Sequence, residues 1–215
     1  MFRSFPLLVV LLSASLTGVG LSDDDATLAP SEKKLPQDFS EAVRDALSPD
    51  GHTVSIAGKP TATMWFREEL PQTNTAEPDL GVSFGTLLES VLVGVVTLDS
   101  RWTDYKGNSI SEGHYTMRYA VQPADGNHMG VSIYRDYLLL IPAAGDADPA
   151  AEFTHDTVVE MSMKGLTHPS VLALFPVWES VSAPALQKND MDQWMLAMPF
   201  GTINLGLTVT GQGEH

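Results

Sequence analysis

Much of the chain is built from segments in which apolar and polar residues alternate at every second position. The clearest segments are HYTMRYAV at residues 114–121 and INLGLTVT at residues 203–210. A period of two is that of a β-strand, because successive side chains point to opposite faces of the sheet. In residues 114–121 the pattern places Tyr119 on the apolar face and Arg118 on the polar one. Further strand-like runs, mostly separated by Gly, Pro, Asn or Asp, lie at residues 52–57, 62–68, 91–98, 131–141, 170–176 and 193–199.

Two segments have the periodicity of a helix instead. In DFSEAVRDALSPDG, Phe39, Val43 and Leu47 fall on one helical stripe, and the residues from Ser48 to Gly51 provide a stop. In FTHDTVVEMSMKG, Thr154 is placed to cap the first turn. Eight or more short strands with one or two short helices predict a mainly β protein, either an antiparallel β-sandwich or an open barrel.

The N-terminus reads as an export signal. Residues 1–22 carry one early positive charge at Arg3, a short apolar stretch and then small residues at which a signal peptidase can cut. Residues 23–37 open with three aspartates and hold few large apolar side chains, which predicts a flexible acidic lead-in. The remaining residues, 38–215, are expected to form a single domain in the periplasm or outside the cell.

Charge and composition exclude several classes of partner. Removal of residues 1–22 leaves 27 acidic against 11 basic side chains, a net charge of −16. Such a surface repels phosphate backbones and anionic lipid surfaces, so neither nucleic acid nor an anionic membrane is an expected partner. No run in the mature chain reaches the length that spans a bilayer. The chain holds no cysteine, so its stability must come from its core.

The segment PADGNHMG, residues 123–130, concentrates polar residues between two strand-like runs. Asp125, Gly126 and Asn127 tolerate the positive φ angles that a hairpin turn requires, so a turn accounts for every residue except His128. The alternative is a metal site assembled by the fold from His114, Asp125, His128 and Asp136. The six histidines include no closely spaced pair of the usual zinc type, and GDADPAAE lacks the pattern of an EF-hand loop.

One string matches a catalytic pattern. GVSFG at residues 81–85 satisfies G-x-S-x-G with Ser83 in the nucleophile position, and Asp156 and His168 follow in the order of a triad. That motif works as a sharp turn between a buried strand and a helix, and the preceding QTNTAEPDL does not read as a buried strand. Glycine patterns that bind phosphates or dinucleotides are absent, and no cofactor is predicted.

Aromatic residues suggest a binding surface. Trp102, Tyr105 and Tyr115 lie around a polar Gly-Asn turn, where exposed rings could stack on a sugar or an apolar ligand. The candidate ligand site consists of Trp102, Tyr105 and His128. The other tryptophans, at positions 65, 178 and 194, are expected in the core. Arg67, Arg118 and Arg135 lie within strands, where cross-strand ion pairs of small energetic consequence are expected. A cluster able to hold a carboxylate is the alternative.

Four stretches carry a resemblance to a known group: KPTATMWFREELP, DLGVSFGTLLES, GNSISEGHYTMRYAVQPADGNHMG and RDYLLLIPAAGDADP. They are similar to a group of exported bacterial proteins of the kind found in soil acidobacteria, for which no activity is assigned. The resemblance implies export and a β-rich fold, and no functional residue comes with it.

Two functions follow as hypotheses. The first is an exported, non-catalytic β-sandwich module that binds a small molecule, a glycan or an envelope protein. The second is a hydrolase, either metal-assisted around His114 and His128 or serine-based at Ser83.

Overall fold

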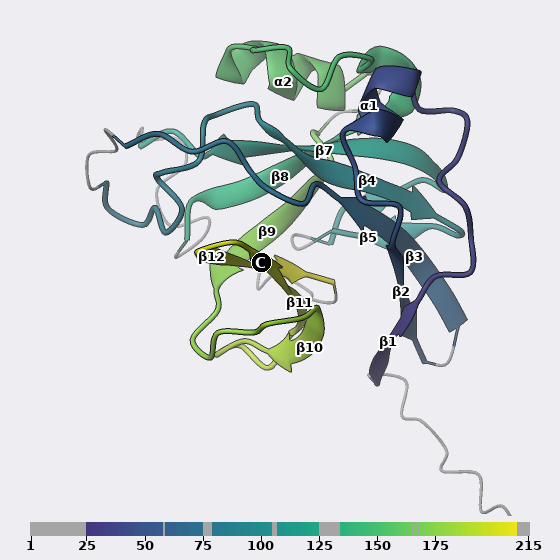
Figure 1. Ribbon diagram of the computed structural model, residues 1–215. Helices are drawn as coiled ribbons and strands as arrows, with labels where there is room; N and C mark the ends of the chain where they lie inside the picture. The colour runs from purple at the N-terminus through teal and green to yellow at the C-terminus, as the bar shows by residue number, and fades with distance from the viewer. Residues whose placement is uncertain are drawn as a thin grey trace, which may run out of the picture.

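The computed structural model describes residues 25–57, 59–74, 79–104, 107–124, 134–164, 166 and 168–209. In this part of the chain, ten strands form one antiparallel sheet whose edge strands contact each other, so that the sheet is nearly closed into a barrel (Figure 1). The open-barrel form of the predicted fold is therefore confirmed. Around the sheet the strands are β1 (Ala26–Pro30), β2 (Gly51–Ile56), β3 (Lys59–Phe66), β4 (Leu92–Leu98), β7 (Gly113–Val121), β8 (Asp136–Pro142), β9 (Val171–Pro176), β12 (Ile203–Thr208), β11 (Trp194–Phe200) and β10 (Ala185–Lys188).

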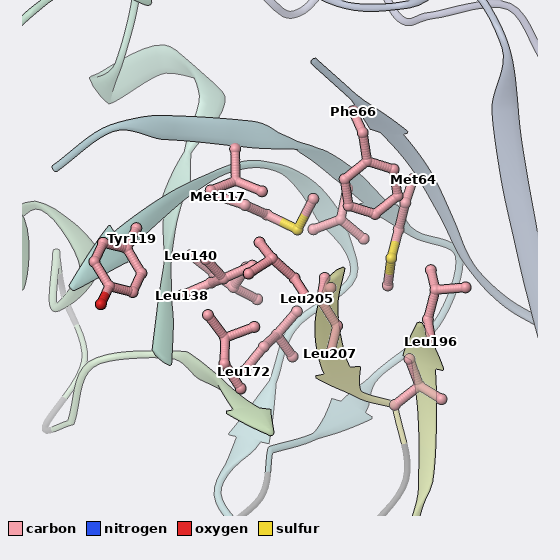
Figure 2. Packing of buried hydrophobic residues seen from close by; sticks show 14 of the residues in the cluster. Met64, Phe66, Met117, Tyr119, Leu138, Leu140, Leu172, Leu196, Leu205 and Leu207 are labelled. Carbon is pink, nitrogen blue, oxygen red and sulfur yellow. The ribbon is translucent and has the colours of Figure 1, made fainter. Parts of the chain in front are cut away.

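Apolar side chains fill the interior of the barrel. Every second residue of β7 and β8 contributes to this core, as alternation requires, and Figure 2 shows the labelled side chains from several strands directed toward one another. Burial of this much apolar surface is the main source of stability for a chain without disulfides. The labelled members are Met64, Phe66, Met117, Tyr119, Leu138, Leu140, Leu172, Leu196, Leu205 and Leu207.

The two ends of the barrel are covered by connections between strands. The connection from β3 to β4 places Phe84 and Leu87 in the core at one end of β4. The connection from β4 to β7 leaves the opposite end of β4 and contains a short pair of strands, β5 (Trp102–Thr103) and β6 (Ser109–Ile110). The indole Nε1–H of Trp102 donates to the carbonyl of Val209 (3.2 Å), which joins this pair to the residue that follows β12.

Two helices lie on the same outer side of the sheet (Figure 1). Helix α1 (Glu41–Asp45) packs Val43 against Trp65 and Leu92, and helix α2 (His155–Ser162) packs Val158 against Leu139. Both begin with a capping hydroxyl: Ser40 Oγ accepts the N–H of Val43, and Thr154 Oγ1 accepts the N–H of Thr157. The cap predicted at Thr154 is confirmed. A 3₁₀ turn (Ala143–Gly145) follows β8.

Strand β7 is buried on both faces, which differs from the expectation of a polar outer face. Arg118 is fully buried, and its guanidinium donates from Nε and Nη2 to the two carboxylate oxygens of Asp146 (2.6 and 2.8 Å). It also donates to three backbone carbonyls, those of Ser90 (2.6 Å), Asp148 (2.6 Å) and Ala151 (3.1 Å). The pair is therefore a buried network and not the exposed cross-strand ion pair that was expected. Both carboxylate oxygens of Asp146 are therefore used by Arg118.

The edges of the sheet contain strands that the sequence did not predict. Residues 26–30, in the segment expected to be a flexible lead-in, form β1 and pair with β2 over five residues. The short strand β10 pairs with β11 at the other edge. Both are held by backbone pairing at an edge, where side-chain alternation is weak, so hydropathy gives little signal.

A search of the described residues for a helix with the length and apolar content needed to cross a membrane finds none.

Replacing Asp146 with Ala is expected to lower the free energy of unfolding by about 3–5 kcal/mol, because it leaves a buried guanidinium without its counter-charge. Urea-induced unfolding followed by tryptophan fluorescence measures this loss. Asp148→Ala is the matched control, since its exposed carboxylate lies in the same segment and its carbonyl still accepts from Arg118; it should cost less than about 1 kcal/mol. Equal losses in the two variants would contradict a dominant role for the buried pair.

Candidate ligand-binding site

His114 and Asp136, two of the four residues proposed for a metal site, lie far apart. His114 lies at the start of β7, whereas Asp136 pairs with Val121 at the far end of that strand, which separates them by about 23 Å at the rise of a β-strand. His114 Nδ1 is hydrogen-bonded to Thr97 Oγ1 (2.9 Å), and its Nε2 lies 3.5 Å from Asp38. Asp125 and His128 lie outside the described residues. Within the described ranges, no group of three or more acidic or histidine side chains is arranged to hold a metal ion.

Ser83 does not lie in a nucleophile elbow. It is exposed in an irregular segment between β3 and β4, with no helix directly after it. Its backbone N–H donates to Asp136 Oδ2 (2.6 Å), and the N–H of Phe84 donates to Asp136 Oδ1 (3.2 Å). The N–H after the serine is the donor that would hold an oxyanion in a G-x-S-x-G enzyme, and here a carboxylate of the protein already occupies it.

The expected positions of the tryptophans are partly wrong. Trp102 is buried in the core, so its ring is not exposed for stacking, whereas Trp178 is 73% exposed although it was expected inside. Trp65 is buried as expected. Immediate neighbours do not give the burial of these residues, because Trp102 lies between the polar Arg101 and Thr103 and is nevertheless buried. Tyr105, the second residue of the candidate aromatic surface, lies outside the described residues.

The structure draws attention instead to residues 79–90, called here the anchored segment. It leads into β4 and covers one end of the barrel, next to the last residues of β7 and the first of β8. Its centre is bound by the Asp136 carboxylate, which also accepts the hydroxyl of Tyr119 (2.6 Å). This buried acceptor fixes the path of a segment that has no regular structure of its own.

The environment of Asp136 changes the ionisation of both partners. Burial raises the pKa of Asp136, and the N–H groups of Ser83 and Phe84 and the hydroxyl of Tyr119 oppose that rise by stabilising the carboxylate. Burial also raises the pKa of Tyr119, as do the charge of Asp136 and its hydrogen bond. Tyr119 therefore keeps its proton and serves as a donor.

Arg135 holds the start of the anchored segment. Its Nη1 donates to Asp79 Oδ2 (2.7 Å) and to the carbonyl of Leu80 (3.0 Å), and its Nε donates to the carbonyl of Gln122 (2.7 Å). Its backbone N–H donates to the carbonyl of Gly81 (2.8 Å). The guanidinium thus ties the anchored segment to the residues that follow β7.

Two clefts open on either side of Glu89, in the anchored segment. The first, of about 430 Å³, lies toward the end of β7 and the start of α2, and the second, of about 410 Å³, lies toward residues 149–153. Either volume suits a small molecule. The first is lined by Asp79, Val82, Gly85, Leu87, Glu89, Tyr119, Val121, Pro123, Arg135 and His155. The second is lined by Arg67, Pro71, Leu88, Glu89, Ser90, Val91, Pro149, Ala150, Ala151, Glu152 and Phe153.

The anchored segment also exposes two large apolar side chains. Leu80 is 92% exposed and Leu88 is 42% exposed, and Leu88 lines the second cleft. Large apolar residues held at the surface beside a cleft are typical of binding sites. Sequence reasoning singled out this segment only for Ser83 and passed over Leu88 and Glu89. The available signal was a stretch with two glycines that still carries three leucines, at positions 80, 87 and 88.

Comparisons with known proteins add no relative: no family model, no curated protein and no solved structure matches the chain.

Replacing Asp136 with Ala is expected to cost about 2–4 kcal/mol of unfolding free energy, because it leaves the N–H groups of Ser83 and Phe84 and the Tyr119 hydroxyl without their acceptor. Chemical denaturation measures the total loss of unfolding free energy. Hydrogen exchange at the amides of Ser83 and Phe84 shows whether the anchored segment becomes more mobile. Ser83→Ala removes only an exposed hydroxyl and should change stability by less than about 0.5 kcal/mol. Unchanged protection of the amides of Ser83 and Phe84 in the Asp136 variant would contradict the anchoring role.

Proposed function

We propose that the protein is an exported, non-catalytic binding module that holds a ligand or an envelope partner in the clefts beside Glu89. The observation that carries this proposal is the anchored segment. Hydrogen bonds to Asp136 and Arg135 hold this segment in place, and its residues Leu88 and Glu89 line a cleft. A surface fixed before the ligand arrives loses less conformational entropy on binding, which favours affinity.

The chemistry of the candidate catalytic groups points in the same direction. The N–H groups of Ser83 and Phe84 are used to bind Asp136, and His114 is hydrogen-bonded to Thr97 at the far end of β7. In the structure these groups make hydrogen bonds that stabilise the fold. The clefts, in contrast, combine apolar walls with a few polar groups, which is the usual composition of a ligand site.

Binding should map to the anchored segment. Titration of the mature, ¹⁵N-labelled protein with sets of small amphiphiles, oligosaccharides and short peptides is expected to shift amide signals of residues 79–90 and 149–155 at the lowest ligand concentrations. Leu88→Ser removes apolar contact area and should weaken the selected ligand about three- to tenfold. Leu166→Ser is the control, since Leu166 is 47% exposed and lines neither cleft. Shifts that gather elsewhere, or no shifts with any set, would contradict the proposal.

The proposal of export rests on the sequence of residues 1–22, so it can be tested separately from the binding function. Expression of the full chain in a bacterial host is expected to give a shortened protein outside the cytosol, with a new N-terminus after one of the residues between Ser13 and Ser22. Leu8→Arg places a charge in the apolar stretch and should block the shortening. Intact-mass measurement of the periplasmic and culture fractions checks both. Full-length wild-type protein confined to the cytosol would contradict export.

A further inference from the structure

The carboxylate of Glu89 lies on the wall between the two clefts, and an inference drawn from it rests on the binding function proposed above. Glu89 Oε1 accepts the backbone N–H of Val121 (3.3 Å) and lies 3.5 Å from His155 Nδ1. Glu89 Oε2 has no hydrogen-bond partner among the residues that the structure describes. The side chain is 48% exposed and lines both clefts, so a carboxylate that the protein holds through Oε1 is accessible to a ligand.

The cationic groups of the clefts are directed toward acceptors of the protein itself. Arg135 donates to Asp79 and to two carbonyls, and Asp79 is thereby neutralised. Arg67 donates from Nε to the carbonyl of Glu69 (3.2 Å). Glu89 and the exposed Glu152 place two negative charges at the second cleft, against the one positive charge that Arg67 keeps, since a backbone carbonyl does not neutralise a guanidinium. A chain of net charge −15 attracts cations toward such a site.

The clefts that Glu89 lines also have apolar walls. Val82, Val121 and Pro123 line the first cleft, and Leu88 and Phe153 line the second. A ligand that matches both the carboxylate of Glu89 and the apolar walls carries one positive group beside an aliphatic or aromatic body. An anion would meet Glu89 and Glu152, and a strongly polar neutral molecule would leave the apolar walls without contacts.

We propose that the site binds small organic cations, with an ammonium or guanidinium group hydrogen-bonded to Glu89 and the apolar body in one of the adjoining clefts. A charge-assisted hydrogen bond supplies direction and selects for the cation, and burial of the body supplies the rest of the affinity. Glu89 is held in place for this role by the Val121 N–H at the end of β7.

Three probes of one shape test the charge preference: 4-phenylbutylamine, 4-phenylbutanol and 4-phenylbutyrate, each titrated calorimetrically into the mature protein at low salt. The amine is expected to bind about fivefold or more tighter than the alcohol, and the carboxylate most weakly, since an ion pair on a half-exposed side chain gives a gain of this size. Added salt should reduce the preference.

Glu89→Gln is the decisive variant, because its amide oxygen still accepts from Val121 and only the charge is lost. It is expected to bring the amine to the affinity of the alcohol, and to leave the alcohol unchanged. Glu160→Gln makes the same change of charge on the exposed face of α2 and lines neither cleft, so it should retain the preference.

The outcomes separate this inference from the binding function on which it rests. Equal affinities for the three probes, or a preference for the amine that survives in Glu89→Gln, would overturn the cation site, while amide shifts in residues 79–90 would still support the binding module. A lack of binding by all three probes together with no shift from any of the wider ligand sets would overturn both.

Discussion

The arrangement of the outer side of the barrel depends on the burial of one arginine. Arg118 leaves the middle of β7 on the face opposite the core, and its planar guanidinium contacts the carboxylate of Asp146 through two nitrogens. The remaining donors bind carbonyls of the anchored segment and of the connection that leads to α2. The ring of Phe153 lies 4.8 Å from the guanidinium carbon and covers it. A buried ion pair contributes little net stability compared with apolar packing, but its fixed geometry specifies which segments meet.

The next residue of β7 performs the equivalent role on the inner face. Tyr119 points into the core and donates to Asp136, and the same carboxylate binds two N–H groups of the anchored segment. Consecutive side chains of a strand point in opposite directions, so adjacent residues of β7 hold this segment from two sides. The position of the anchored segment beside the clefts therefore depends on β7.

The sequence predicted the larger part of the fold, and the reason is that the core follows alternation. Strands such as β7 and β12 lie where the period of two placed them, and the cap at Thr154 begins α2. The edge strands β1 and β10 escaped prediction, because each is short and packs one leucine on the core, Leu28 in β1 and Leu186 in β10, so the alternation is weak. Arg118 was misread for a related reason. Periodicity indicates on which face of a strand a residue lies, but it does not indicate what covers that face. In this structure α2 and the segment that precedes it cover the outer face of β7.

The candidate site was much harder to predict, because it depends on contacts between residues far apart in the sequence. The G-x-S-x-G pattern directed attention to Ser83, whereas the structure uses the backbone of that segment and not the serine hydroxyl: Asp136, 53 residues further along the chain, binds the amide of Ser83. Glu89 gave no signal, since an acidic residue beside leucines resembles any solvated surface position. Its proposed role depends on β7, which supplies an N–H for one carboxylate oxygen, and on the two clefts that the folded side chain lines.

A filled barrel also constrains where a ligand can bind. The interior positions of β7, β8, β9 and β12 are occupied by tightly packed leucine, methionine and aromatic side chains, so a ligand that entered there would have to displace core contacts worth about 1.5–3 kcal/mol for each large side chain (Figure 2). At the periphery no such cost arises, because the anchored segment already leaves Leu88 and one oxygen of Glu89 exposed to solvent. On the proposal that the clefts beside Glu89 bind a ligand, the apolar interior provides stability, and an irregular segment that buried polar groups hold in position provides recognition. For this reason, changes at Glu89 and Leu88 should alter binding without unfolding the protein, whereas changes at Arg118 and Asp136 should alter both.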